Sequence, residues 1–171
     1  YPHIGHAKAI FVNYELAKKY NGKFILRFED TNPKLAEKEF YKIHLDNYEW
    51  LGIKPDLVEY ASDYVPKFYE LAKEMLSKGY AYMCTCHQED IKKNRFEGKE
   101  CSCRILMENE HENRLDKMFK AKEGEMVLRL KGYMNHANTT MRDPALLRII
   151  EHEHARQGKK YRLWPTYDFE N

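Results

Sequence analysis

The spacing of apolar and polar residues along the first eighty positions predicts three helices and one short strand. Apolar side chains lie on most sides of the first predicted helix, so we expect it to be buried. The second helix should begin at Pro33 with Asn32 as its N-cap, a common arrangement at helix starts. The expected elements are a helix over 4–20, a strand over 23–28, a helix from Pro33 to about Leu51, and an amphipathic helix over 65–78. Helices and strands of these lengths in this order are typical of α/β architecture.

From Tyr80 onward the pattern changes to short apolar runs separated by polar stretches. We expect a mostly antiparallel α+β subdomain there, distinct from the first part of the chain. Its expected elements are strands over 80–84, 126–134, 141–150 and 160–164, a polar helix over 108–122, and a loop over 135–140. Because a parallel sheet has strands on both sides of each crossover helix, we also expect a strand upstream of Tyr1 and a longer whole protein.

Composition and charge narrow the classes of protein. Of 171 residues, 43% are hydrophobic, and no apolar run approaches the roughly 20 residues of a membrane span, which excludes a membrane protein. The net charge is only +2, yet residues 126–164 hold eight Lys and Arg against three acidic residues. This local excess suggests a surface for phosphates, with chance clustering as the alternative.

Two short motifs near the start could carry chemistry. His3 and His6 are three residues apart, so they share one face in the first turn of a helix, where anions are favoured. Gly5 between them allows a flat ligand to approach the backbone. Glu29 follows the first strand, at the edge where α/β sheets bind ligands, and could hold a substrate ammonium group. The alternatives are two ordinary histidines and a charged turn.

Four cysteines form two Cys-x-Cys pairs, namely Cys84, Cys86, Cys101 and Cys103. Four thiolates suit a tetrahedral Zn²⁺ with a structural role, because no coordination position stays open for catalysis. The alternatives are four free thiols and a site in which His87 replaces one cysteine. Paired cysteines of this kind favour a reducing, cytoplasmic location. The other histidines have no informative spacing, and we assign them to the surface: His44, His111, His136, His152 and His154.

Several motifs together resemble the catalytic domain of class I aminoacyl-tRNA synthetases, in the glutamyl/glutaminyl branch and most like its archaeal-type glutamyl members. The resemblance covers essentially the whole chain. Its motifs are Pro2-His3-Ile4-Gly5-His6-Ala7, Leu26-Arg27-Phe28-Glu29-Asp30-Thr31-Asn32-Pro33, Glu49-Trp50-Leu51-Gly52, Ala61-Ser62-Asp63, Lys78-Gly79-Tyr80-Ala81-Tyr82, Met141-Arg142-Asp143-Pro144 and Trp164-Pro165-Thr166-Tyr167-Asp168-Phe169. By this resemblance the fold is the first half of a Rossmann-type nucleotide-binding domain, interrupted by an inserted α+β subdomain that binds the tRNA acceptor stem.

The resemblance also implies roles for particular residues. His3 and His6 would be catalytic and bind the ATP phosphates, Gly5 would lie under the adenosine, Glu29 would hold the α-amino group of the amino acid, and Tyr167 would line the amino-acid pocket. Residues 1–79 would be the first Rossmann segment, 80–163 the inserted zinc-bearing subdomain, and 164–171 the return to the Rossmann sheet.

The resemblance further implies partners and cofactors. The basic stretch, including Lys159, Lys160 and Arg162, would contact the acceptor end of tRNA(Glu), with tRNA(Gln) as a second candidate. ATP with Mg²⁺, glutamate and a structural Zn²⁺ complete the expected ligands. No Lys-Met-Ser-Lys-Ser-like loop or anticodon-binding domain is present, so residues 1–171 alone should be inactive. The alternatives are a glutaminyl enzyme, a paralogue that glutamylates a modified tRNA nucleoside, and a non-catalytic, zinc-stabilised RNA-binding module.

Overall fold

The computed structural model describes residues 1–170, which divide into two compact units. Unit 1 contains residues 1–63 and 153–158, and unit 2 contains 64–152 and the residues from 159 onward. The predicted return segment 164–171 is therefore described except for its last residue. The segment boundaries expected at 79/80 and 163/164 stay a prediction. Among the described residues, no helix is long and apolar enough to cross a bilayer.

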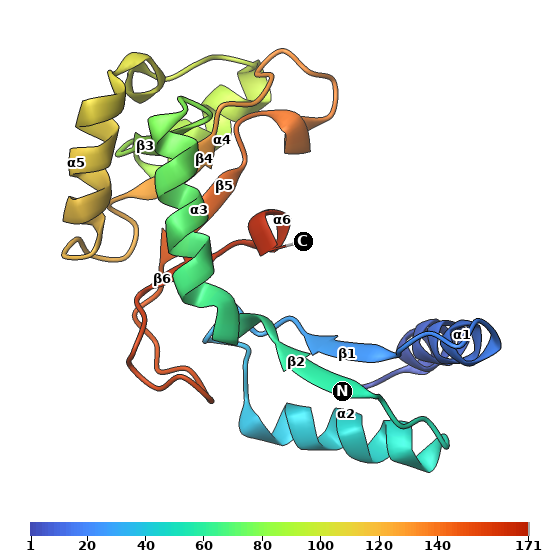
Figure 1. The fold of residues 1–171 in the computed structure, drawn as a ribbon. Coiled ribbons are helices and arrows are strands. Elements are labelled where there is room, and N and C mark those ends of the chain that lie inside the picture. The colour runs from blue at the N-terminus through green and yellow to red at the C-terminus, as the bar shows by residue number, and fades with distance from the viewer. Residues whose placement is uncertain (171) are drawn as a thin grey trace. The chain divides into compact units, whose positions relative to one another are not determined.

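Unit 1 is built around two parallel strands joined by a crossover helix (Figure 1). Its elements are α1 (Ile4–Lys19), β1 (Ile25–Phe28), α2 (Lys38–Trp50), β2 (Leu57–Tyr60) and most of a 3₁₀ turn, η1 (Ala61–Tyr64). The strands pair from Ile25 opposite Leu57 to Phe28 opposite Tyr60, so their carboxyl ends meet at one edge. This parallel pairing confirms the predicted α/β class.

Two details of unit 1 differ from the sequence prediction. The helix expected from Pro33 begins at Lys38 instead, because Asn32 caps an isolated turn: its side-chain oxygen accepts the N–H of Lys34, and its carbonyl accepts that of Leu35. Strand β2 was not predicted at all. Its four residues follow Pro55-Asp56 and are too few to stand out from a loop.

The prediction that the first helix is buried is wrong for the described residues. Only Ile10 of α1 is buried, where it packs in a small core with Phe24, Tyr48 and Ile53. Ile4 and Phe11 are exposed by 85% and 52%. A helix with apolar residues on most sides needs neighbours on several sides, and within unit 1 only one side of α1 has them.

Unit 2 is an antiparallel four-stranded sheet in the order β3-β4-β5-β6, as the sequence predicted for this part of the chain. Its elements are α3 (Val65–Ser77), β3 (Ala81–Cys84), α4 (Gln88–Glu97), η2 (Ser102–Ile105), α5 (Glu108–Met118), β4 (Val127–Leu130), η3 (Thr139–Met141), β5 (Ala145–Ile149), β6 (Leu163–Pro165) and α6 (Tyr167–Glu170). Helix α4 was not predicted, because it has no buried residue and hence no apolar stripe.

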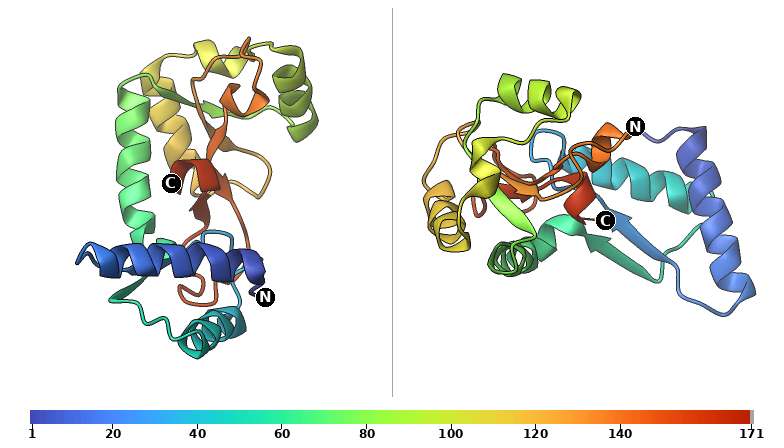
Figure 2. Two further views of the ribbon diagram at one scale, coloured as in Figure 1. Left: turned by 90° about the vertical axis from the view of Figure 1, so that its right-hand side faces the viewer. Right: turned by 90° about the horizontal axis from the view of Figure 1, so that it is seen from above.

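The two faces of this sheet have different coverings, and β3 shows the division. Ala81 and Met83 point into the main core with α3 and α5, whereas Tyr82 and Cys84 point to the opposite face. Figure 2 shows α3 and α5 side by side on one face of the sheet and α4 beyond the other. The alternation of side chains along a strand thus separates a purely apolar core from a face that carries the cysteines.

Candidate functional site

The two histidines at the start of α1 cap the helix reciprocally. His3 is the N-cap residue, and its Nδ1 accepts the N–H of Gly5 at 3.1 Å. His6 Nδ1 accepts the N–H of His3 at 3.2 Å. The ring centres are 4.1 Å apart, and both residues are exposed. The structure therefore brings the two predicted histidines together at a helix N-terminus.

This capping fixes how the two imidazoles can act on a ligand. Because Nδ1 of each ring accepts a backbone N–H, the neutral ring carries its proton on Nε2. The Nε2–H groups are then the donors that each ring can offer outward. The first turn of α1 contains no acidic residue, so the positive end of the helix dipole is not offset there. The arrangement favours an anion such as a phosphate.

Gly5 is required by the cap itself. A Cβ at this position would lie 2.8 Å from Cε1 of His3, closer than side-chain carbons approach in proteins. Any larger residue would push the His3 ring away and break its hydrogen bond with the N–H of residue 5. The glycine thus keeps both rings in place.

His44 on α2 extends the pair, although the sequence prediction placed it on the surface. Its ring centre lies 5.5 Å from that of His6, edge to face, and its Nδ1 is 2.7 Å from the Tyr48 hydroxyl. His44 is half-buried, and burial, followed by the charge of His6, lowers its pKa so that it stays neutral. The signal that could have found it is the i, i+4 spacing of His44 and Tyr48 on one helical face.

Glu29 lies where the two parallel strands end, as predicted. It is exposed, and its Oε1 accepts the Thr31 hydroxyl at 2.5 Å. Glu29 and His44 both line a pocket of about 270 Å³ that also includes Tyr1. His44 therefore connects the histidine pair to the pocket of Glu29.

The neighbouring Asp30 is a buried support for this strand edge. Its carboxylate accepts the N–H and the hydroxyl of Ser62, both at 2.8 Å, and the hydroxyl of Tyr41 at 2.9 Å. Burial, together with the charge of Asp30, raises the pKa of Tyr41, so the hydroxyl keeps its proton and stays a donor. Because its oxygens accept hydrogen bonds from Ser62 and Tyr41, Asp30 fixes this edge of the two strands.

His154 is a second buried support, and its assignment to the surface was wrong. Its Nε2 donates to the carbonyl of Asp30 at 2.7 Å, and its Nδ1 accepts the N–H groups of Arg156 and Gln157. These bonds tie residues 153–158 to the end of β1. An alternating His-x-His pattern in a polar stretch gives no sign of such burial.

His111 in unit 2 was also wrongly assigned to the surface. It is buried in α5, its Nδ1 accepts the N–H of Met83 at 3.2 Å, and burial lowers its pKa. His136 and His152 are exposed, as predicted.

The residues predicted to contact the amino acid and tRNA in unit 2 differ in their surroundings. Tyr167 is the first residue of α6 and is 65% exposed. Lys159 and Lys160 are exposed. Arg162 instead donates to the carbonyls of Phe119 and Ala121 at the end of α5 and forms an ion pair with Glu151. These bonds hold the Arg162 guanidinium at the end of α5, and its contact with tRNA stays a prediction.

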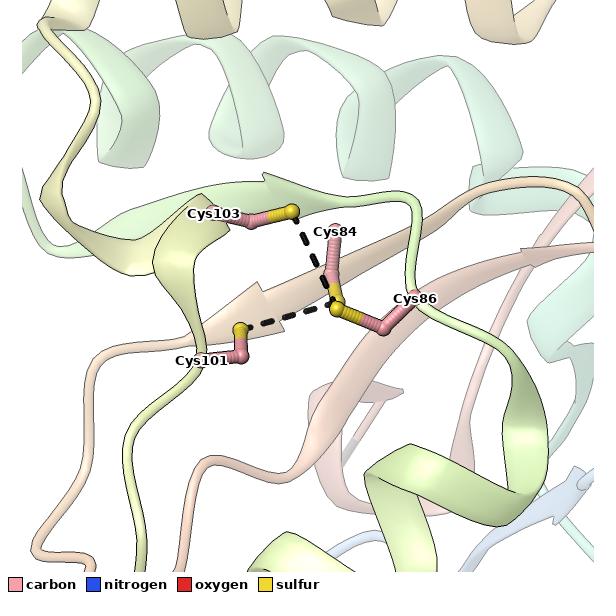
Figure 3. A group of neighbouring side chains, drawn as sticks. All are labelled: Cys84, Cys86, Cys101 and Cys103. Carbon is pink, nitrogen blue, oxygen red and sulfur yellow. Dashed lines mark hydrogen bonds between the residues drawn. The ribbon is translucent and has the colours of Figure 1, made fainter.

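The four predicted cysteines converge on one point, although they come from two segments of the chain. All four sulfur atoms lie within 4.8 Å of one another (Figure 3). Cys84 and Cys101 Sγ are 3.9 Å apart, and Cys86 and Cys103 Sγ are 4.0 Å apart. A tetrahedral Zn²⁺ with Zn–S bonds of about 2.3 Å separates its sulfurs by about 3.8 Å. The donor set and its spacing fit such an ion.

The surroundings lower the pKa of Cys101 and Cys103 and raise that of Cys84 and Cys86, so negative charge is favoured on two of the four sulfurs. The hydrogen bond between Cys84 and Cys101 raises the pKa of Cys84 and lowers that of Cys101 to about 4, so the pair shares one proton. Arg114 Nη1 lies 3.8 Å from Cys103 Sγ, and the Tyr82 hydroxyl lies 3.8 Å from Cys101 Sγ.

Asp143 supports the face of the sheet that carries the cysteines. The residue is buried and has a left-handed backbone, with φ of 42°. Its Oδ2 accepts the Tyr82 hydroxyl at 2.9 Å and Arg104 Nε at 3.1 Å, and its Oδ1 accepts the N–H of Gly132 at 2.7 Å. The carboxylate thereby fixes Tyr82 beside Cys101.

Comparisons with known proteins agree on one family. Residues 1–171 match the family described as tRNA synthetases class I (E and Q), catalytic domain. The chain is 48% identical over 170 residues to a glutamate–tRNA ligase of Nitrosopumilus maritimus (strain SCM1), and the match covers 99% of this chain and 30% of that protein. It is 46% identical to the glutamate–tRNA ligase of Pyrococcus horikoshii, with 98% and 30% covered.

A solved structure has the same fold. The glutamate tRNA ligase of Elizabethkingia meningosepticum CCUG26117, in complex with its amino acid, superposes with a TM-score of 0.69 at 21% identity, covering 99% of this chain and 38% of that one. The chain spans 30% of the length of the two curated relatives named above.

Proposed function

Because this chain belongs to the class I tRNA synthetases of the E and Q group, we propose that it is part of the catalytic domain of a glutamate–tRNA ligase. The whole protein would activate glutamate with ATP to glutamyl-adenylate and transfer it to tRNA(Glu). The observation that carries the proposal is the capped histidine pair, which offers two Nε2–H donors at a helix N-terminus. A cytoplasmic location is part of this proposal.

In the first step, a carboxylate oxygen of glutamate attacks the α-phosphorus of ATP and pyrophosphate leaves. Negative charge then builds up on the α-phosphate oxygens. The Nε2–H groups of His3 and His6 donate to these oxygens, and their backbone caps hold the rings so that little reorganisation is needed. Mg²⁺ that arrives with ATP would supply positive charge for the leaving pyrophosphate. Gly5 lies under the adenosine in this proposal, and its lack of a side chain serves both the ligand and the cap.

The amino acid is held by the exposed Glu29 at the end of β1, which takes the α-ammonium group. Tyr167, the first residue of α6, would line the amino-acid pocket, as the family resemblance implies. Asp30 supports Glu29 from behind without competing for the ligand, because its oxygens are occupied by Ser62 and Tyr41. Glutamate is favoured over glutamine because eight curated relatives at 41–48% identity all bear the name glutamate–tRNA ligase.

A structural Zn²⁺ would occupy the cysteine cluster of unit 2. Cys84 and Cys86 from the end of β3, and Cys101 and Cys103 from η2 and the residue before it, supply four thiolates at tetrahedral spacing. When bound, the ion links two chain segments and stabilises the fold around them. With four protein ligands it leaves no position for substrate.

The acceptor end of tRNA would bind to the inserted subdomain over 80–163, with residues 1–79 and 164–171 as parts of the Rossmann domain. Lys159 and Lys160 are exposed and suited to phosphate contacts. The expected role of Arg162 is less favoured, since its guanidinium already binds two carbonyls and Glu151.

The test is ATP–pyrophosphate exchange by the full-length protein with saturating tRNA(Glu), first with glutamate and then with glutamine. We expect exchange with glutamate alone. Exchange with glutamine alone would identify a glutaminyl enzyme, and exchange with neither would favour a zinc-stabilised RNA-binding module. Charging of tRNA(Gln) beside tRNA(Glu) is measured in the same preparation and decides whether the second tRNA is also a substrate.

A further inference from the structure

Unit 2 contains a pocket that the proposed function does not use. It has a volume of about 350 Å³ and lies on the cysteine-bearing face of the sheet, between β4, β5 and α4. Its walls are mainly apolar and include Ile91, Met126 and Val127. A volume of this size is within the range of small-ligand sites.

Two arginines on adjacent strands line this pocket, and each has a buried guanidinium nitrogen without a hydrogen-bond partner. Arg129 on β4 is 2% exposed, and its Nε donates to the carbonyl of Asp143, yet its Nη2 is buried without a partner. Arg148 on β5 likewise has a buried Nε without a partner. Buried donors of this kind are costly unless something accepts their hydrogen bonds.

The remaining charges of the lining do not pair with these two donors. The carboxylate of Asp143 is already bound by Tyr82, Arg104 and the N–H of Gly132. Glu123 accepts the N–H of Glu151. Lys92 and Arg95 of α4 add two more positive charges to the lining. Four cationic side chains against two carboxylates and the sulfur of Cys86 still leave an excess of positive charge, which suits an anion such as a phosphate.

We propose that this pocket binds a small organic phosphate, with the phosphate on Arg129 and Arg148 and an apolar body against Ile91 and Met126. The planar guanidinium fork matches the oxygens of a phosphate and can hold two at once. The competing explanation is that the arginines only offset the charge of the nearby thiolates. It applies to Arg129, whose charge helps to lower the pKa of Cys101. Among the described residues no hydrogen bond joins Arg148 to a cysteine, and its buried Nε has no partner.

The test uses the full-length protein and phenyl phosphate as the probe, with phenol and inorganic phosphate as its two halves. Binding is followed through the ¹³C-methyl NMR signal of Met126, assigned with Met126→Leu. We expect a saturable shift with phenyl phosphate and at least tenfold weaker binding of inorganic phosphate, because the apolar walls then contribute nothing. Phenol should bind more weakly still, since the buried guanidinium groups would stay unpaired.

Arg148→Gln should weaken phenyl phosphate binding at least tenfold, and Arg129→Met should do the same. Lys120→Gln, an exposed charge outside the pocket, is the matched control and should change nothing. Zinc content and melting temperature show whether each variant is folded. If Arg129→Met is not folded, the variant of the half-buried Arg148 decides the outcome.

No saturable shift in the wild type, equal binding of inorganic phosphate, or unchanged affinity in folded Arg148→Gln would overturn the proposal. ATP–pyrophosphate exchange reports on the other site and is measured separately.

Discussion

The histidine pair of unit 1 and the cysteine cluster of unit 2 are both short, regularly spaced motifs, but the structure arranges their donor atoms in opposite ways. His3 and His6 use one ring nitrogen each for the backbone and are exposed, so the second nitrogen can meet a ligand from solution. The four cysteine sulfurs instead face one another, and three of the four residues are buried. The first arrangement suits a substrate that is exchanged in every cycle, and the second suits an ion that stays.

The interactions that hold the two sites in place also differ: those of the histidines are local, and those of the cysteines join distant segments. The histidine caps are made within three residues of one helix end, so they can be lost without disturbing the rest of unit 1. The cysteines join β3 to a segment seventeen residues later and share Tyr82 with the buried Asp143. Removing a histidine should therefore affect the reaction rate, whereas removing a cysteine should affect the fold.

The largest effect is expected at the cysteine cluster. Cys101→Ser should reduce bound zinc from about one per chain and lower the free energy of unfolding by about 4 kcal/mol or more, because metal binding is coupled to folding. Metal analysis and urea denaturation measure the two quantities. Ser102→Ala, an exposed change between two of the ligands, is the control and should leave both unchanged. Unaltered stability after complete chelation would show that the cluster does not need a metal.

The next effect concerns the histidines. His6→Ala in the full-length enzyme should lower the adenylation rate about 10²–10³-fold, the scale for losing one preorganised donor to a transition-state oxyanion. The apparent affinity for ATP should change much less, since the donor acts on charge that develops during the reaction. Presteady-state adenylate formation with saturating tRNA measures both, and His136→Ala serves as the matched exposed imidazole.

The opposite result, a change in ATP affinity without a change in the adenylation rate, would contradict the mechanism. If His6→Ala keeps its rate and loses ATP affinity, the histidines only bind the nucleotide. Unfolding experiments on the same variant should show little change, which separates this site from the cysteine cluster.

The same contrast explains what the sequence could predict. Both motifs stand out in the sequence because His-x-x-His and paired Cys-x-Cys are local patterns, and the structure brings the members of each together. Their roles stay a prediction. The residues that support them were missed. Asp30, His44 and His154 act through partners 4 to 124 positions away, and single polar residues show no sign of such partners.

Secondary structure was predicted where a local period exists and missed where it does not. Helix α3 has four buried residues on one face and was placed almost to its ends. Strand β2 is four residues long, and α4 buries none of its side chains, so neither gives a periodic signal. Asn32-Pro33 is a strong helix start signal, yet it caps a turn here, because the helix itself begins only after Glu37.

A smaller effect on stability is expected at Asp30, which tests whether the strand edge has a buried support of its own. Asp30→Asn keeps the size but replaces one acceptor oxygen by an NH₂ group that faces the donors of Ser62 and Tyr41. We expect a loss of roughly 2–3 kcal/mol in the free energy of unfolding, from an unmade charged hydrogen bond in a buried place. Asp46→Asn on the exposed side of α2 is the control. Glu29→Gln should leave stability unchanged and weaken glutamate binding; an equal loss of stability in both variants would contradict the division of roles between the two carboxylates.

The smallest effect is expected at the basic residues after β5. Lys159→Ala combined with Lys160→Ala should raise the KM for tRNA roughly three- to tenfold and reduce the slope of log KM against log salt concentration by about 1.4 to 1.8, since each phosphate contact contributes about 0.7 to 0.9. Stability should not change, because both side chains are exposed.

Arg162→Ala should behave oppositely: it removes the bonds to the end of α5 and to Glu151, so it should lower stability by about 1–2 kcal/mol and leave the salt slope as it is. Aminoacylation at several salt concentrations and urea denaturation distinguish the two patterns. A change of slope in Arg162→Ala without loss of stability would return this arginine to the tRNA surface that the sequence predicted.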